Sequence, residues 1–160
     1  MLFSIGPFIG SGYSWNEEDR SLLLQKFESM YQLGVRGFAV FFDDISGEGT
    51  KADKQAELLN YIDDHFVKVK RDVAPLILCP TEYNKSWTDV EGGYLTTLGD
   101  KLNEGIKVMW TGDMVVATID KSTLDFVNPL LKRKRTLVEF PRFGLCTRPF
   151  AARAGLWKRA

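Results

Sequence analysis

Apolar residues return at helical spacing in four parts of the chain, with polar residues between them. The first part follows Asn16, which can cap a helix and precedes three acids that the helix dipole favours. Gly34 stands in the usual place of a glycine that ends a helix. The pattern therefore predicts a helix over about residues 17–33. Its predicted apolar face carries Leu22, Leu23, Phe27, Met30 and Tyr31.

The same spacing predicts three more helices. They cover about residues 52–69, 95–102 and 122–131, and Pro129 interrupts the last of them. The longest of the three is predicted to bury one stripe of side chains, made of Ala52, Leu59, Ile62 and Phe66.

Between these helices lie three largely apolar segments, at residues 36–43, 74–80 and 106–113, and the first is unbroken from Gly37 to Phe42. A strand that is apolar on both faces is typical of a parallel sheet covered by helices. Strands and helices alternate at these spacings. The sequence therefore predicts βαβ units in an α/β fold with a parallel sheet.

Polar side chains appear where each run ends. Asp43 and Asp44 close the first run, Glu82 and Tyr83 follow the second, and Thr111 lies near the end of the third. Because the carboxyl ends of parallel strands meet at one edge, we expect these segments to form a common rim. Adjacent residues of an extended chain point to opposite faces, so the two aspartates should have different roles. Acid–base catalysis needs such a separation of carboxyl pKa values.

Each of these residues also has a plain structural interpretation. Asp43 and Asp44 could cap the turn that follows them. That turn is rich in glycine but lacks the Lys-Ser/Thr pair of a phosphate-binding loop, so we do not expect it to bind phosphate. Trp87 and Trp110 could form a wall for a sugar ring or belong to the core. His65, the only histidine, falls near the buried face of a predicted helix and is expected to be structural. With a single histidine, the chain is therefore a poor candidate for a Ser-His-Asp triad and for a His-rich zinc site.

Composition narrows the class of protein to which the chain can belong. A chain of 160 residues with 44% hydrophobic residues suits one domain or part of a larger one. No apolar run approaches the length of a membrane span, and no basic residue precedes the apolar start that a signal peptide would need. Cys79 and Cys146 fit neither a metal site nor a disulfide framework.

Charge is unevenly placed. The segment Lys132–Ala160 holds nine of the 21 Lys and Arg residues but only one of the 21 acids, Glu139. An acidic body with a basic tail is typical of a protein that binds nucleic acid through an arm.

The motifs taken together resemble a known family. The strings YQLGVRGFAVFFDDISGEGT, LCPTEYNKSW and VMWTGD resemble the catalytic domain of family 84 glycoside hydrolases. These are β-N-acetylglucosaminidases that include protein O-GlcNAcases and bacterial enzymes once called hyaluronidases. The similarity covers about residues 15–133. It implies a partial (β/α)8 TIM barrel, because the family barrel is about twice as long as this chain.

The resemblance also implies a site and a mechanism. Asp43 matches the acid that orients the acetamido N–H of the substrate, and Asp44 matches the general acid and base. Tyr83 matches a tyrosine that hydrogen-bonds the acetamido group, and Thr111 and Val115 match residues that line the pocket. The acetamido oxygen of the substrate is the nucleophile, so the enzyme supplies none. The implied partner is a GlcNAc-containing glycan or glycoprotein, and neither metal nor cofactor is implied; the resembling bacterial enzymes are generally exported.

The tail departs from the family pattern. Family members continue with a strand that reads roughly W-W-N-F-P-V-S-D-Y-V-R-D, and only F-P agrees with this chain. Codons allowed for residues 137–158, read one nucleotide on, can spell the family strand. We therefore divide the chain into an incomplete catalytic barrel, 1–134, and an aberrant basic tail, 135–160, that we interpret as frameshifted. The basic charge is then a by-product, and no nucleic-acid or membrane partner is expected.

Two functional hypotheses remain. The first is a β-N-acetylglucosaminidase of which this chain has little or no activity, with exposed sheet edges through which copies can associate. The second is a non-catalytic α/β module that binds sugar or nucleic acid through a basic arm.

The encoding DNA tests the frameshift. We expect the codons of residues 137–158, read one nucleotide on, to spell the family strand, because a chance run of permitted codons this long is rare. Sequencing the gene measures this directly. Codons that cannot spell that strand would end the interpretation.

Overall fold

The computed structural model describes residues 2–5, 15–43, 45–118, 120–132 and 137–139. Strands and helices alternate along this part of the chain. The strands are β1 (Leu2–Ile5), β2 (Gly37–Phe41), β3 (Ile77–Cys79), β4 (Lys107–Trp110) and β5 (Leu137–Glu139). The helices are α1 (Glu17–Gln32), α2 (Ala52–Ile62), α3 (Tyr94–Lys101) and α4 (Lys121–Leu130). Short turns of other helix types complete the order, η1 (Gly47–Thr50), η2 (Asp63–Val67) and η3 (Lys85–Trp87).

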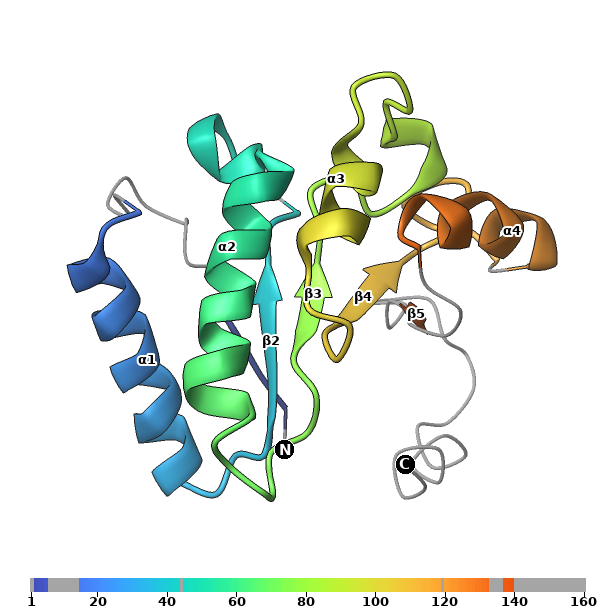
Figure 1. Cartoon of the computed structure of the whole chain (residues 1–160). Helices are drawn as coiled ribbons and strands as arrows, with labels where there is room; N and C mark the ends of the chain where they lie inside the picture. Colours follow the sequence, from blue (N-terminus) through green and yellow to red (C-terminus); the bar gives the residue numbers. More distant parts are fainter. Residues whose placement is uncertain (1, 6–14, 44, 119, 133–136, 140–160) are drawn as a thin grey trace, which may run out of the picture.

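All described strands belong to one sheet in the order β1-β2-β3-β4-β5, and every pair is parallel. Figure 1 shows β2, β3 and β4 pointing toward the same end, with α2 in front of β2, α1 at the left of the view and α4 at the right. The helices return the chain from the carboxyl end of one strand to the start of the next. The predicted α/β fold with a parallel sheet is therefore confirmed.

The predicted helices are also confirmed, with small shifts at their ends. The predicted interruption at Pro129 is wrong, because Pro129 lies inside the last turn of α4. Asn16 caps α1 by accepting a hydrogen bond from the Asp19 amide at 2.8 Å. The predicted helix 52–69 is α2 followed by the π-helical turn η2, and its predicted stripe is buried. Leu22 was wrongly assigned to the buried face of α1, because its side chain is 55% exposed while the neighbouring Leu23 packs inward. Helical spacing cannot separate two adjacent leucines at the margin of an apolar face.

The hydrophobic pattern does not predict β1 or β5. Both are as short as β3 and β4, but no longer apolar segment was recognised as a strand around them. β5 lies in the segment that the sequence assigned to the tail, and it pairs with β4 through Val108–Leu137 and Met109–Val138. The division at residue 134 stays a prediction.

The main core lies between the sheet and its helices. Phe38, Val40 and Phe42 alternate along β2 and its continuation, and all three side chains are fully buried against the helices. Phe27 of α1 stacks on Phe38 with ring centroids 5.1 Å apart, and Phe66 of η2 meets both rings edge-on. This aromatic cluster joins α1, β2 and η2 near the start of β2.

A second, smaller cluster occupies the opposite face of the sheet. It contains Ala39, Ile77, Cys79, Tyr83 and Met109, all buried. Strand residues alternate between the two faces, which explains why the predicted strands are apolar throughout.

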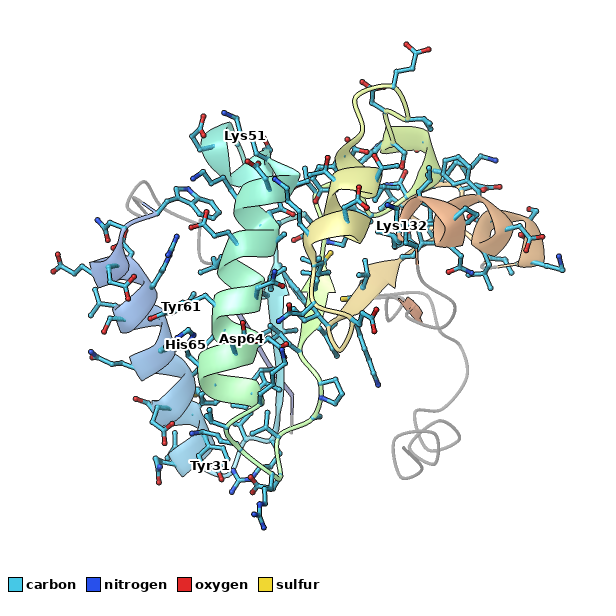
Figure 2. The ribbon with its side chains drawn as sticks, viewed as in Figure 1. Tyr31, Lys51, Tyr61, Asp64, His65 and Lys132 are labelled. Carbon is cyan, nitrogen blue, oxygen red and sulfur yellow. The ribbon has the colours of Figure 1, made fainter. Side chains whose placement is uncertain are left out.

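The two ends of the sheet differ in character. At the base, where the strands begin, Asp72 accepts hydrogen bonds from the Tyr31 hydroxyl and from Arg36 Nε, at 2.9 and 2.6 Å. These donors, Tyr31 first, hold the pKa of Asp72 below its usual range. Figure 2 places Tyr31 at this lower end and Lys51, at the start of α2, at the opposite end where the strands finish.

Among the described helices, none combines the length and the apolar character that crossing a membrane requires.

The aromatic cluster predicts a stability effect. Phe27→Ala should lower the free energy of unfolding by about 3–5 kcal/mol, because it leaves a cavity beside Phe38 and Phe66. Leu33→Ala is the control, since Leu33 is 75% exposed and its change should cost less than about 0.5 kcal/mol. Urea titration followed by circular dichroism measures both. Equal losses of unfolding free energy in the two variants would contradict the assignment of Phe27 to the core. If Phe27→Ala does not fold, the milder variant Phe27→Leu is compared with Leu33→Ala instead.

Candidate functional site

The carboxyl end of β2 delivers Asp43 to the rim. The amide of Phe42 donates a hydrogen bond to the Cys79 carbonyl at 2.9 Å, which holds the end of β2 against β3. Asp43 follows directly and is half-buried. Within the described part of the chain, no hydrogen bond or ion pair engages its carboxylate. The side chain is thus placed at the strand end without being used in the scaffold.

Tyr83 and Thr111 come together from the next two strands. The amide of Thr111 donates to the Tyr83 carbonyl at 3.0 Å, and both side chains are buried, with 5% and 7% of Thr111 and Tyr83 exposed. The Thr111 hydroxyl donates to the Met114 carbonyl at 2.7 Å, so its lone pairs remain for a further donor. The loops after β3 and β4 therefore form one unit.

Further main-chain bonds extend this unit. The amides of Lys85 and Ser86 donate to the carbonyls of Gly112 and Asp113, at 2.9 and 3.0 Å. Gly112 has a φ of 104°, a conformation that favours glycine and turns the chain sharply after β4. Val115 lies in the turn that follows and is 44% exposed.

The two candidate tryptophans have different environments. Trp110 is fully buried, and its indole N–H donates to Thr123 Oγ1 at 3.0 Å, so it belongs to the core. Trp87 is 49% exposed and meets the Tyr83 ring edge-on, with centroids 4.9 Å apart. Only Trp87 is therefore available at the rim to contact a ligand.

Burial shapes the electrostatics of the rim. Cys79 is fully buried, and burial and the nearby Asp43 carboxylate both raise the pKa of its thiol far above the usual range. Glu82 is half-buried, and desolvation raises the pKa of its carboxyl even though the Asp89 amide donates to it at 3.2 Å. Burial thus disfavours the charged forms of Cys79 and Glu82 at this end of the sheet.

Other sequence-predicted residues lie elsewhere. Asp44 falls outside the described residues. His65 is exposed rather than buried, because it sits on the outer side of η2, and its Nδ1 lies 2.9 Å from the Tyr61 carbonyl. Figure 2 shows His65 between α1 and α2, away from the strand ends. No cluster of three or more His, Cys, Asp or Glu suited to a metal occurs among the described residues.

The sequence argument missed one polar residue behind the rim. Gln55 lies on the buried stripe of α2 and is fully buried between Ala52 and Leu59. The available signal was a glutamine on an otherwise apolar helix face, since a buried polar side chain requires hydrogen-bond partners.

A family model described as beta-N-acetylglucosaminidase matches residues 1–141. The chain belongs to this family. The resemblance to family 84 glycoside hydrolases is thereby confirmed, and the matched residues include the ends of β2, β3 and β4 described above.

Curated relatives agree with this assignment. The chain is 31% identical over 142 residues to protein O-GlcNAcase from Rattus norvegicus and equally to that from Mus musculus. The alignments cover 83% of this chain but 15% of each relative. The chain thus spans a small part of the length of the curated relatives that it matches.

Solved structures give the architecture. The structure of CpGH84B superposes with a TM-score of 0.72 at 33% identity, over 85% of this chain and 25% of that chain. An O-GlcNAc hydrolase mutant from Thermobaculum terrenum gives 0.72 at 28% identity, over 88% and 32% of the two chains. The parallel sheet is therefore part of a TIM barrel, and the second cluster of Ala39, Cys79 and Met109 lies on the face that a closed barrel turns inward.

The buried thiol predicts low reactivity. In a Cys146→Ser background, Cys79 should react with iodoacetamide roughly 100-fold more slowly in the native chain than in urea, because the thiol is buried and protonated. Adding Val116→Cys supplies an accessible control, since Val116 is 75% exposed. Mass spectrometry after timed quenching measures both sites. Fast native labelling of Cys79 would show that the carboxyl end of β3 is open to solvent.

Proposed function

We propose that this chain supplies part of the active site of a β-N-acetylglucosaminidase that removes GlcNAc by a substrate-assisted retaining mechanism. The observation that carries the proposal is the position of Asp43. It directly follows β2, whose end is bonded to β3, and the loops after β3 and β4 that bear Tyr83 and Thr111 are bonded to each other, in a chain of this family.

The chemistry explains why two aspartates are adjacent. The acetamido carbonyl oxygen of the substrate attacks C1 of its own sugar, and the bond from C1 to the leaving oxygen breaks. Asp44 gives its proton to the leaving oxygen. It then removes a proton from the water that opens the oxazoline at C1, which restores the β configuration. This differs from the two-carboxylate scheme, because the substrate provides the nucleophile.

Asp43 serves the other end of the same sugar. Its carboxylate accepts a hydrogen bond from the acetamido N–H and stabilises the positive charge that develops as the oxazoline forms. The half-buried position of Asp43, whose charge reaches the buried Cys79, supports this role, because water screens a half-buried carboxylate less than an exposed one.

The remaining residues position the sugar. The Tyr83 hydroxyl donates to the acetamido oxygen, and its ring is held by the edge of Trp87. Thr111 and Val115 line the pocket for the N-acetyl group. No step in this scheme requires a metal or a cofactor.

The natural substrate class is a GlcNAc-containing glycan or glycoprotein. The chain spans a quarter of the CpGH84B structure, so most sugar contacts of a complete barrel come from other segments. Those contacts position the sugar for reaction, and their absence should cost this chain most of its rate. We therefore expect the complete barrel to be active and this chain to have little or no activity.

An aryl β-N-acetylglucosaminide assay tests the proposal in a complete barrel that carries these residues. Asp44→Asn should lower kcat/KM by roughly 100-fold or more for a poor leaving group and by less for an activated phenol, which needs no proton. Asp43→Asn should lower it for both, because oxazoline formation is impaired in each case.

Asp125→Asn is the control, since Asp125 is exposed on α4 and pairs with Lys121. An inert complete barrel, or an Asp44→Asn variant with intact activity on poor leaving groups, would refute the proposed β-N-acetylglucosaminidase activity. Binding of DNA by the 160-residue chain, with a steep salt dependence, would instead favour the non-catalytic module with a basic arm.

A further inference from the structure

Gln55 is the centre of a closed hydrogen-bond network behind the rim. Its side chain is fully buried in the first turns of α2, where its neighbours on the helix face are apolar. Its Nε2 donates to the Gly49 carbonyl at 2.7 Å and to Thr81 Oγ1 at 2.8 Å. Its Oε1 accepts a hydrogen bond from the Tyr94 hydroxyl. Every donor and acceptor position of the side chain except one lone pair is used.

The rest of the network fixes the direction of each bond. The Thr81 amide can only donate, and it donates to the Tyr94 hydroxyl oxygen at 2.9 Å. Tyr94 must therefore donate its own proton to Gln55 Oε1. Burial raises the pKa of the Tyr94 hydroxyl, which keeps that proton in place. Gln55 thus has one permitted amide orientation, and a side chain without its donors cannot replace it.

The network holds both ends of the segment that carries the two acids. Thr81 Oγ1 donates to the Phe42 carbonyl at 2.9 Å, directly before Asp43. Gly49, whose carbonyl accepts a hydrogen bond from Gln55, lies six residues after Asp43 and forms the other end of the segment. The segment between them therefore has two fixed anchor points, and both depend on Gln55 or on its partner Thr81.

The same network holds the neighbouring loop. Thr81 begins the segment that leads to Tyr83, and its amide and hydroxyl are both engaged. A shift of Gln55 would therefore move Asp43 and Tyr83 relative to each other, although none of the hydrogen bonds described for Gln55 goes to either residue.

We propose that Gln55 is a positioning residue that sets the Asp43–Asp44 segment against the Tyr83 loop, through Thr81, Tyr94 and the Gly49 carbonyl. The catalytic part of this inference rests on the function proposed above, whereas the anchoring part does not. The chain offers a matched control in Asn60, an amide on the same helix. Its Nδ2 donates to the Lys101 carbonyl at 2.7 Å, and its Oδ1 accepts from the Asn103 amide, at the opposite end of α2.

Hydrogen–deuterium exchange of the 160-residue chain tests the anchoring without any assay. Gln55→Glu places a carboxylate where two donors are needed, and Tyr94→Phe removes one bond of the network with a smaller change. Both should raise exchange in the peptide 43–51 by about 10-fold or more, with little change in 106–111. Asn60→Asp should leave 43–51 unchanged and raise exchange near 100–104. Unchanged exchange at 43–51 in both network variants, or an equal rise throughout the chain, would overturn the inference.

Kinetics of the complete barrel test the positioning. Gln55→Glu should lower kcat by about 10- to 100-fold with little change in KM, because misplaced acids affect the transition state more than sugar binding. The ratio of variant to parent kcat should rise as the pH falls, since a buried carboxyl at this site has a raised pKa and regains a donor when protonated. Tyr94→Phe should also lower kcat, but the ratio of its kcat to that of the parent should not rise as the pH falls. Asn60→Asp should retain the parent kcat.

The two failures are distinguishable. An inert parent barrel refutes the proposed function, and the exchange experiment still decides whether Gln55 anchors the segment. An active parent with a Gln55→Glu variant of unaltered kcat, or of equally lowered kcat at every pH, refutes the positioning role.

Discussion

The peptide units on either side of Phe42 set the position of everything that follows at the rim. The amide of Phe42 donates to the Cys79 carbonyl, and the carbonyl of Phe42 accepts from Thr81 Oγ1. β3 and its loop thus hold the chain immediately before Asp43 from both directions. The backbone from which the Asp43 side chain extends is therefore fixed in position. Preorganised charge of this kind interacts with a developing charge without first having to be ordered.

Neighbouring loops are joined by the same principle. Thr111 bonds the Tyr83 carbonyl, and Lys85 and Ser86 bond the loop after β4. Main-chain bonds depend little on side-chain identity, so the loops remain attached while the side chains that they present can differ. The rim is therefore a rigid frame made mostly of backbone, with its chemistry on a small number of side chains.

Much of this arrangement could be predicted from the sequence. Unbroken apolar runs such as that of β2 identify buried parallel strands, and the rule that parallel strands end at one edge brings Asp43, Tyr83 and Thr111 together. Motif similarity gave their expected roles. The strand assignments succeed because strand direction and side-chain alternation are properties of the local chain, whereas the residue roles stay predictions.

Contacts between distant segments could not be predicted in the same way. The Gln55 network depends on the angle at which α2 and α3 meet the sheet, which no local pattern encodes. Trp87 and Trp110 differ in exposure because of the loop shapes around them, and single-sequence reasoning left both possibilities open. The strands β1 and β5 are identified by their pairing with β2 and β4, because no longer apolar segment was recognised as a strand around them.

The aromatic cluster of Phe27, Phe38 and Phe66 lies toward the start of β2, whereas Asp43 lies where β2 finishes. Folding and chemistry thus draw on different ends of the same elements. Substitutions in the loops at one end leave the main apolar contacts at the other end intact. A lineage could accordingly explore new sugar preferences by drift in those loops while its scaffold persisted, which makes this architecture evolvable.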